Sequence, residues 1–147
     1  MDRIFRLLLV DDEPHVTGAL SLQLEAREDL DVYIANSAAE TLNVLRKTRI
    51  DLMVSDIRMP GMTGLELLSR VQKEPPDCKV ILLTGYADFN YVYEAMRQGA
   101  AGYVLKNSTP EQLRQAVHDV AAGGSYIHPT MASLLAKHAG NPEANDP

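Results

Sequence analysis

The chain has one cysteine, only short apolar runs and no excess of basic residues. Cys78 alone cannot form a disulfide within the chain, so a reducing compartment is the default expectation. The apolar run near the N-terminus is short and ends in Asp11-Asp12-Glu13, which is typical of neither a signal peptide nor a membrane span. The formal net charge of −6 argues against binding to nucleic acid or to an anionic membrane, because both favour a basic face. We therefore expect a cytoplasmic protein with no membrane partner.

What the chain does have is enough length for one core and a regular series of short apolar runs. Its 147 residues are 46% hydrophobic, which suits a single compact domain. The runs IFRLLLV, DVYIA, DLMVS, VILLT and GYVLK are typical of strands buried on both faces of a parallel sheet. Between them, residues 37–40, 63–66 and 109–112 match the capping box that begins helices, and Pro14 suits a first turn. This alternation predicts five βα units that end near Gly124.

Alternating strands and helices imply right-handed crossovers, with helices on both faces of the sheet. Five strands can be ordered in several ways. The order 2-1-3-4-5 places side by side the four strands that end in polar residues, whereas the second strand ends in Ala35-Asn36-Ser37 and offers no charge. We therefore predict an α/β fold with a doubly wound five-stranded parallel sheet of the flavodoxin-like (βα)5 type, in the order 2-1-3-4-5.

The character of the chain changes after Gly124, so we predict one domain over residues 1–124 and a separate segment over residues 125–147. Apolar residues in this segment follow helical spacing, and Pro129 suits a first turn. They are Ile127, Met131, Leu134 and Leu135. We expect a short amphipathic helix, which bridges to an output domain or to a second subunit, followed by a polar, Pro-rich linker or tail from Gly140.

Polar residues stand at the ends of four predicted strands. They are Asp11 and Asp12 after the first, Asp56 after the third, Thr84 after the fourth and Lys106 after the fifth. Because the carboxyl ends of parallel strands line one crevice, these residues should meet there. Three carboxylates, a hydroxyl and an amine suit a divalent cation and a phosphoryl group, and Mg²⁺ prefers oxygen ligands. A carboxylate can also accept a phosphoryl group as an aspartyl phosphate.

Each of these residues also has a plain structural interpretation. Adjacent aspartates often cap a helix, an aspartate before Pro60-Gly61 is typical of a turn, a strand-ending threonine is usually structural, and a lone lysine is usually a solvated charge. Their joint placement at ends that one topology makes neighbours is what favours the functional interpretation.

Four motifs, taken in order, give the chain a family resemblance. They are LLLVDDEP, DLMVSDIRMPGMTGLELL, VILLTGYAD and GAAGYVLK. Residues 4–124 resemble the receiver domain of response regulators in bacterial two-component signalling. The segment GAAGYVLKNSTPEQLRQAVHDVAAGGSYIHP resembles, more narrowly, the NarL/FixJ (LuxR-type) class, although GYADFNYVYEAM also resembles receivers attached to AraC-type output domains.

The resemblance implies a phosphoacceptor site that uses Mg²⁺. Asp56 would take the phosphoryl group from a histidine kinase. Asp12, Asp56 and the backbone carbonyl of Arg58 would bind Mg²⁺ directly, and Asp11 would help through water. We also expect Arg58 and Tyr86, at the mouth of the site, to lengthen the phosphoryl lifetime by shielding it from water, unless they are two solvated loop residues.

The resemblance further implies a switch. Thr84 would hydrogen-bond the phosphoryl group, Lys106 would pair with it, and Gly85 would leave room for it to reach a backbone N–H. Tyr103 matches the aromatic switch position, which a half-buried strand tyrosine would also suit. One departure concerns Asn107, because many receivers have a cis proline there; a cis bond to a non-proline residue costs about 3 kcal/mol, so we expect trans.

Three function hypotheses follow. The first is a phosphorylation-controlled receiver, which is a phosphoacceptor switch with self-catalysed phosphoryl transfer and autodephosphorylation and not an enzyme. It would act in transcription regulation and contact DNA only through an output domain, and a homodimer is a candidate partner arrangement. The second is a haloacid-dehalogenase-type phosphohydrolase, whose nucleophile would follow the first strand in an Asp-x-Asp pattern where this chain has Asp-Asp-Glu. The third is a degenerate receiver that only binds partners.

Overall fold

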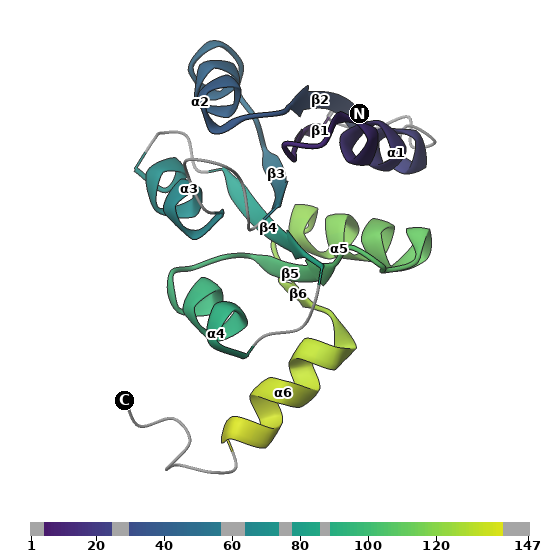
Figure 1. The fold of residues 1–147 in the computed structure, drawn as a ribbon, viewed down its shortest axis with the longest axis vertical. Coiled ribbons are helices and arrows are strands. Elements are labelled where there is room, and N and C mark those ends of the chain that lie inside the picture. Colours follow the sequence, from purple (N-terminus) through teal and green to yellow (C-terminus); the bar gives the residue numbers. More distant parts are fainter. Residues whose placement is uncertain (1–4, 25–29, 57–63, 74–77, 86–88, 140–147) are drawn as a thin grey trace.

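The computed structural model of the chain describes residues 5–24, 30–56, 64–73, 78–85 and 89–139. A parallel sheet of six strands in the order β2-β1-β3-β4-β5-β6 lies between helices on both faces (Figure 1). The strands are β1 (Phe5–Val10), β2 (Leu30–Ala35), β3 (Leu52–Asp56), β4 (Lys79–Thr84), β5 (Gly102–Leu105) and β6 (Tyr126–Ile127). The helices are α1 (Pro14–Leu24), α2 (Ala38–Lys47), α3 (Gly64–Val71), α4 (Phe89–Arg97), α5 (Pro110–Ala121) and α6 (Pro129–Ala139). None of these helices is long and apolar enough to cross a membrane.

Successive side chains of a strand point to opposite faces, so the buried strands build two cores. On one face, Leu8, Met53 and Leu82 pack with residues of α3 and α4; on the other, Leu7 and Val54 pack with residues of α1 and α5. Figure 1 shows α1 and α5 together on one side of the sheet and α2, α3 and α4 on the other. The predicted flavodoxin-like parallel fold is therefore confirmed, with the first five strands in the predicted order.

The helix starts follow the capping residues. Thr109 closes a full capping box with Gln112: its hydroxyl accepts from the Gln112 N–H, and the Gln112 side chain accepts from the Thr109 N–H. Ser37 caps α2 by accepting from the Glu40 N–H, but the Glu40 carboxylate accepts from the N–H of Asn36 instead of the cap residue. The expected cap at Thr63 lies outside the described residues.

The prediction of five strands was wrong by one strand. β6 adds to the open edge of β5, where the Tyr126 N–H donates to the Ala101 carbonyl and the His128 N–H to the Tyr103 carbonyl, both at 3.0 Å. A strand of two residues has no apolar periodicity to reveal it, which is the reason the sequence pattern missed it. Gly102 permits the pairing, because a Cβ there would lie 2.9 Å from the Tyr126 carbonyl oxygen.

The predicted amphipathic helix over the C-terminal segment is present as α6. Its Met131 is fully buried in the core that also contains Tyr103 and Val92 of α4, and Leu134 and Leu135 pack against the same core. The apolar stripe of α6 thus covers part of the domain itself, next to α4 (Figure 1). The division of the chain at Gly124 remains a prediction.

Candidate functional site

The carboxyl ends of β1 and β3 bring three carboxylates together. Asp11 and Asp12 follow β1, and Asp56 is the last residue of β3. One oxygen from each carboxylate lies within 4.8 Å of the others. Asp11 is fully buried and Asp56 is 5% exposed, whereas Asp12 is exposed to solvent. Oxygen ligands gathered in this way, from a buried wall with one open side, fit a small divalent cation.

Lys106, which follows β5, completes the cluster. Its Nζ lies 3.2 Å from Asp11 Oδ2 and 3.3 Å from Asp56 Oδ2. Burial alone lowers the pKa of Lys106, but the charge of Asp56 and the hydrogen bond and charge of Asp11 outweigh burial, so the pKa is raised above its ordinary value of 10.5. The amine is therefore charged at neutral pH. One ammonium against three carboxylates leaves two formal negative charges, which a divalent cation would balance.

Thr84 ends β4 beside this cluster and is buried. The Lys106 N–H donates to the Thr84 carbonyl at 2.6 Å, so the two strand ends are held in register. Among the residues that the structure describes, none lies within 4 Å of a Cβ built at the next residue, Gly85, and this leaves open space beside Thr84. After Lys106, the Ser108 N–H donates to the Leu105 carbonyl and turns the chain into α5.

The end of β2 also reaches the site, which the sequence reasoning missed. The Asn36 Nδ2 donates to the Asp11 carbonyl at 2.8 Å and to the Thr17 hydroxyl at 3.1 Å. Asn36 carries a neutral amide, whereas the site residues predicted at strand ends were mostly charged. The predicted strand order could have indicated this role, because it places the second strand, which ends at Asn36, next to the strand that carries Asp11.

Tyr103 lies in β5 and is fully buried, whereas its plain structural interpretation was a half-buried strand tyrosine. The predicted roles of Arg58 and Tyr86, and of the turn at 59–61, fall outside the described residues. The structure thus brings Asp11, Asp12, Asp56 and Lys106 into one cluster, with Thr84 at the adjoining strand end.

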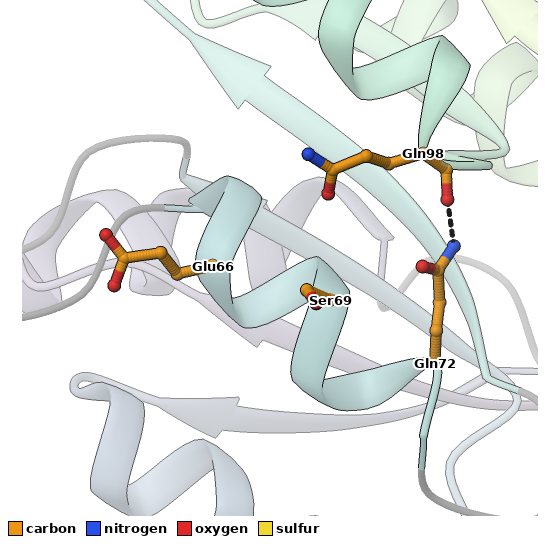
Figure 2. Close-up of a pocket in the computed structure, with 4 residues that line it drawn as sticks. All are labelled: Glu66, Ser69, Gln72 and Gln98. Atoms are coloured by element: carbon orange, nitrogen blue, oxygen red, sulfur yellow. Dashed lines mark hydrogen bonds between the residues drawn. The ribbon is translucent and has the colours of Figure 1, made fainter.

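A separate hollow of about 350 Å³ lies between α3 and α4. It is lined by Glu66, Ser69, Gln72 and Gln98, none of which belongs to the cluster. Figure 2 shows the Gln72 side chain pointing to the backbone carbonyl of Gln98, which accepts a hydrogen bond from its Nε2. An adjoining hollow of about 170 Å³ is lined in part by Gln72, Cys78 and Lys79. We call these two hollows together the α3–α4 groove.

Comparisons with known proteins agree with this geometry. Residues 7–118 match the family described as the response regulator receiver domain. The oxygen regulatory protein NreC of Staphylococcus carnosus is 33% identical over 145 residues, which cover 96% of this chain and 66% of NreC. The DNA-binding transcriptional activator DevR/DosR of Mycobacterium tuberculosis is 36% identical over 144 residues, which cover 97% of this chain and 66% of DevR/DosR. The chain therefore spans about two thirds of the length of these curated relatives.

Solved structures give the same assignment. A two-component response regulator of the LuxR family from Aurantimonas sp. SI85-9A1 superposes with a TM-score of 0.87 at 29% identity, covering 92% of this chain and 98% of that chain. The family match spans most of the chain, and both the relatives and the structure point to one class within it. The chain belongs to the response-regulator receiver domain family, in its NarL/LuxR-type class.

Proposed function

We propose that this receiver accepts a phosphoryl group on Asp56 from the phosphohistidine of a histidine kinase. The observation that carries the proposal is the contact of Lys106 Nζ with both Asp11 and Asp56, at 3.2 and 3.3 Å, inside a cluster of three carboxylates. A positive charge is thus already held beside the carboxylate that would receive a phosphoryl group. The family assignment decides against the haloacid-dehalogenase class.

Each residue has a defined part in the transfer. An Asp56 carboxylate oxygen forms a bond to phosphorus as the bond from phosphorus to the histidine nitrogen breaks, and the histidine leaves with that electron pair. Lys106 then pairs with a phosphoryl oxygen, and Thr84 donates its hydroxyl to another. Mg²⁺, when bound, offsets charge on the phosphoryl oxygens in a loose transition state. Asp12, Asp56 and the Arg58 carbonyl would hold the ion directly, and Asp11 through water.

Removal of the phosphoryl group is part of the same proposal. Water attacks phosphorus and returns the Asp56 carboxylate, so the domain acts as a timed switch and not as an enzyme that turns over a substrate pool. Gly85 leaves the approach open, and Arg58 and Tyr86 shield it from water. The open space beside Thr84 supports this arrangement.

The output is a change of the face made by α4, β5 and α5. Thr84 moves to the phosphoryl group, and Tyr103 turns into the space that Thr84 leaves. Tyr103 shares a buried core with Met131 and Val92, so movement of its ring would disturb the packing of α6 on α4. Such a shift requires that the phosphoryl group bind one state better than the other.

In its biological setting, we propose that the domain is cytoplasmic and controls transcription through an output domain. The relative DevR/DosR, which is named a DNA-binding transcriptional activator, supports the role in transcription. Receiver dimers are one way to transmit the change. The domain alone has a net charge of −6, so residues 1–147 should give no sequence-specific shift of DNA at physiological salt.

A direct test uses acetyl phosphate with Mg²⁺ and intact-mass spectrometry. The wild-type chain should gain one phosphoryl group, and labelling should stop when Mg²⁺ is chelated. Asp56→Asn should not label, whereas the matched control Asp31→Asn, an exposed aspartate on β2, should label normally. Full labelling of Asp56→Asn would refute the assignment. Failure of the wild type to bind beryllofluoride with Mg²⁺ would favour the degenerate receiver instead.

A further inference from the structure

The acidic cluster contains one carboxylate whose placement needs an explanation. Asp11 is held by Lys106 and by the N–H of Glu13, which donates to Asp11 Oδ1 at 3.0 Å, and Asp56 is held by Lys106. Asp12 is exposed, and among the described residues no hydrogen bond or ion pair holds its carboxylate. Its oxygen nevertheless lies within 4.8 Å of the other two. The backbone that leads to Asp12 must therefore set its position.

That backbone is held by Asn36. The peptide group between Asp11 and Asp12 carries the Asp11 carbonyl, which accepts from Asn36 Nδ2 at 2.8 Å. The preceding peptide N–H, that of Asp11, donates to the Ala35 carbonyl at 3.2 Å. Asp11 and Asp12 belong to the loop that follows β1, which we call the acidic loop. Two successive peptide groups of this loop are thus held by the end of β2, and the second of them sets the direction of the Asp12 side chain.

Asn36 is itself fixed from two sides. Its Nδ2 also donates to the hydroxyl of Thr17, a buried residue of α1 that donates in turn to the Pro14 carbonyl at 3.0 Å. Its own N–H donates to the Glu40 carboxylate of α2 at 2.6 Å. The amide is therefore a rigid link between β2, α1, α2 and the acidic loop.

We propose that Asn36 is a positioning residue for the cation site, which holds Asp12 at the distance from Asp56 that a divalent ion requires. The inference rests on the proposed function, since it assumes that this cluster binds the ion. Residues that orient metal ligands without touching the metal typically change its affinity by about 10- to 100-fold when they are removed. A carbonyl acceptor requires a donor, so an apolar side chain at 36 should free the loop.

The experiment measures Mn²⁺ affinity by electron paramagnetic resonance and Mg²⁺ affinity by competition, on the folded chain without any phosphoryl donor. Asn36→Ala should raise the Kd for both ions about tenfold. Asn43→Ala is the matched control, because it removes an exposed amide from α2, and its Kd should stay at the wild-type value. Equal affinities for Asn36→Ala and Asn43→Ala would overturn the proposal.

A second comparison separates positioning from general stability. Thr41→Val removes a buried hydroxyl that donates to the Ser37 carbonyl at 2.8 Å, so it should lower the melting temperature without changing the Kd. In phosphorylation by acetyl phosphate, Asn36→Ala should raise the Mg²⁺ concentration for half-maximal rate by the same tenfold factor, with the rate at saturating Mg²⁺ nearly unchanged. A loss of affinity in Thr41→Val equal to that in Asn36→Ala would show a structural effect only.

Failure of the proposed function would look different. A wild-type chain that binds neither ion would refute the cation site itself, whereas a wild type that binds while Asn36→Ala binds equally well would refute only the role of Asn36. If Asn36→Ala does not fold, Asn36→Ser replaces it. A serine hydroxyl lies one bond nearer the main chain than Nδ2 and cannot span the same distance to the Asp11 carbonyl, so the same tenfold rise is expected.

Discussion

Two ionisable side chains at opposite ends of the sheet differ in charge state because their neighbouring charges differ. At the carboxyl ends, Lys106 lies between Asp11 and Asp56, and these opposite charges raise its pKa, so the partly buried amine remains charged. At the amino ends, the half-buried Cys78 lines the α3–α4 groove, and partial burial of the thiol first and the negative charge of Asp51 second raise its pKa to about 12. The thiol therefore remains neutral.

The difference shows that the charged neighbours of a side chain, more than the volume of a nearby hollow, identify the end of this domain where the phosphoryl chemistry is proposed. The larger hollow of the α3–α4 groove has a volume of about 350 Å³, yet among the described residues that line this hollow only Glu66 is charged (Figure 2). The cluster at the other end gathers four charged side chains within hydrogen-bond or ligand distance. Four predictions test this contrast between the two ends of the domain.

The largest expected effect concerns Cys78. At neutral pH a pKa near 12 instead of 9.0 should slow alkylation by iodoacetamide roughly a thousandfold relative to the urea-unfolded chain, because the thiolate is the nucleophile. Since the folded pKa is the higher one, this group's contribution to stability is fully present below pH 9 and is lost as the pH rises toward 12. Alkylation followed by mass spectrometry measures the rate. Equal rates in the folded and unfolded chains would contradict the raised pKa of Cys78 in the folded chain.

Replacing the Lys106 ammonium should slow the phosphoryl transfer strongly. Lys106→Met should slow phosphorylation by acetyl phosphate by about a hundredfold, because charge on the phosphoryl oxygens loses a fixed partner. Without Mg²⁺ it should also lower the free energy of unfolding by about 1–3 kcal/mol, because Asp11 stays buried. Lys79→Met, an exposed lysine beside the α3–α4 groove, is the control and should react like the wild type.

A smaller effect is expected at the adjoining strand end. Thr84→Ala should slow phosphorylation by about tenfold, because a hydrogen bond to a charged group contributes about 1.5 kcal/mol at the low end of its range. Thr84→Ser keeps the hydroxyl and should restore most of the rate. The time course of intact mass measures both variants, and an unchanged rate in Thr84→Ala would remove the hydroxyl from the proposed mechanism.

The smallest effect should come from the α3–α4 groove. Gln72→Ala removes the hydrogen bond to the Gln98 carbonyl and should lower the free energy of unfolding by about 0.5–1 kcal/mol. Phosphorylation should not change. Gln98→Ala leaves the accepting carbonyl in place and removes a different hydrogen bond, from Gln98 Nε2 to Glu94 Oε1, so urea denaturation should show a loss of similar size. A clear loss of phosphorylation in Gln72→Ala would show that the two ends of the domain are coupled.

Much of this arrangement was predictable because it depends on strong, local patterns. Apolar runs such as Leu7–Val10 predict buried strands. In a parallel sheet the carboxyl ends of these strands lie at one edge, so Asp11, Asp56 and Lys106 are expected there. The four consecutive residues from Thr109 to Gln112 likewise predicted the capping box that begins α5. The arrangement of these features follows from backbone periodicity and from the chemistry of strand ends.

The missed features depend on contacts that leave no local pattern. β6 is stabilised by two backbone hydrogen bonds to its neighbour, and backbone groups are the same in every residue. The side-chain amide of Asn36 donates to the Asp11 carbonyl and the Thr17 hydroxyl, and these acceptors lie close to it only in the folded chain. Met131 followed helical spacing, but the surface that it covers could be known only after α4 and β5 were placed.

The short length of β6 bears on how copies of this domain would associate. An exposed strand edge offers unpaired N–H and C=O groups to any other chain, and very short edge strands followed by proline limit that risk. β6 has two residues and is followed closely by Pro129, so it is a poor template for further strands. β2, at the other edge, has six residues and an Ile34 side chain that is 42% exposed. Aggregation through sheet extension at high concentration would therefore begin at β2.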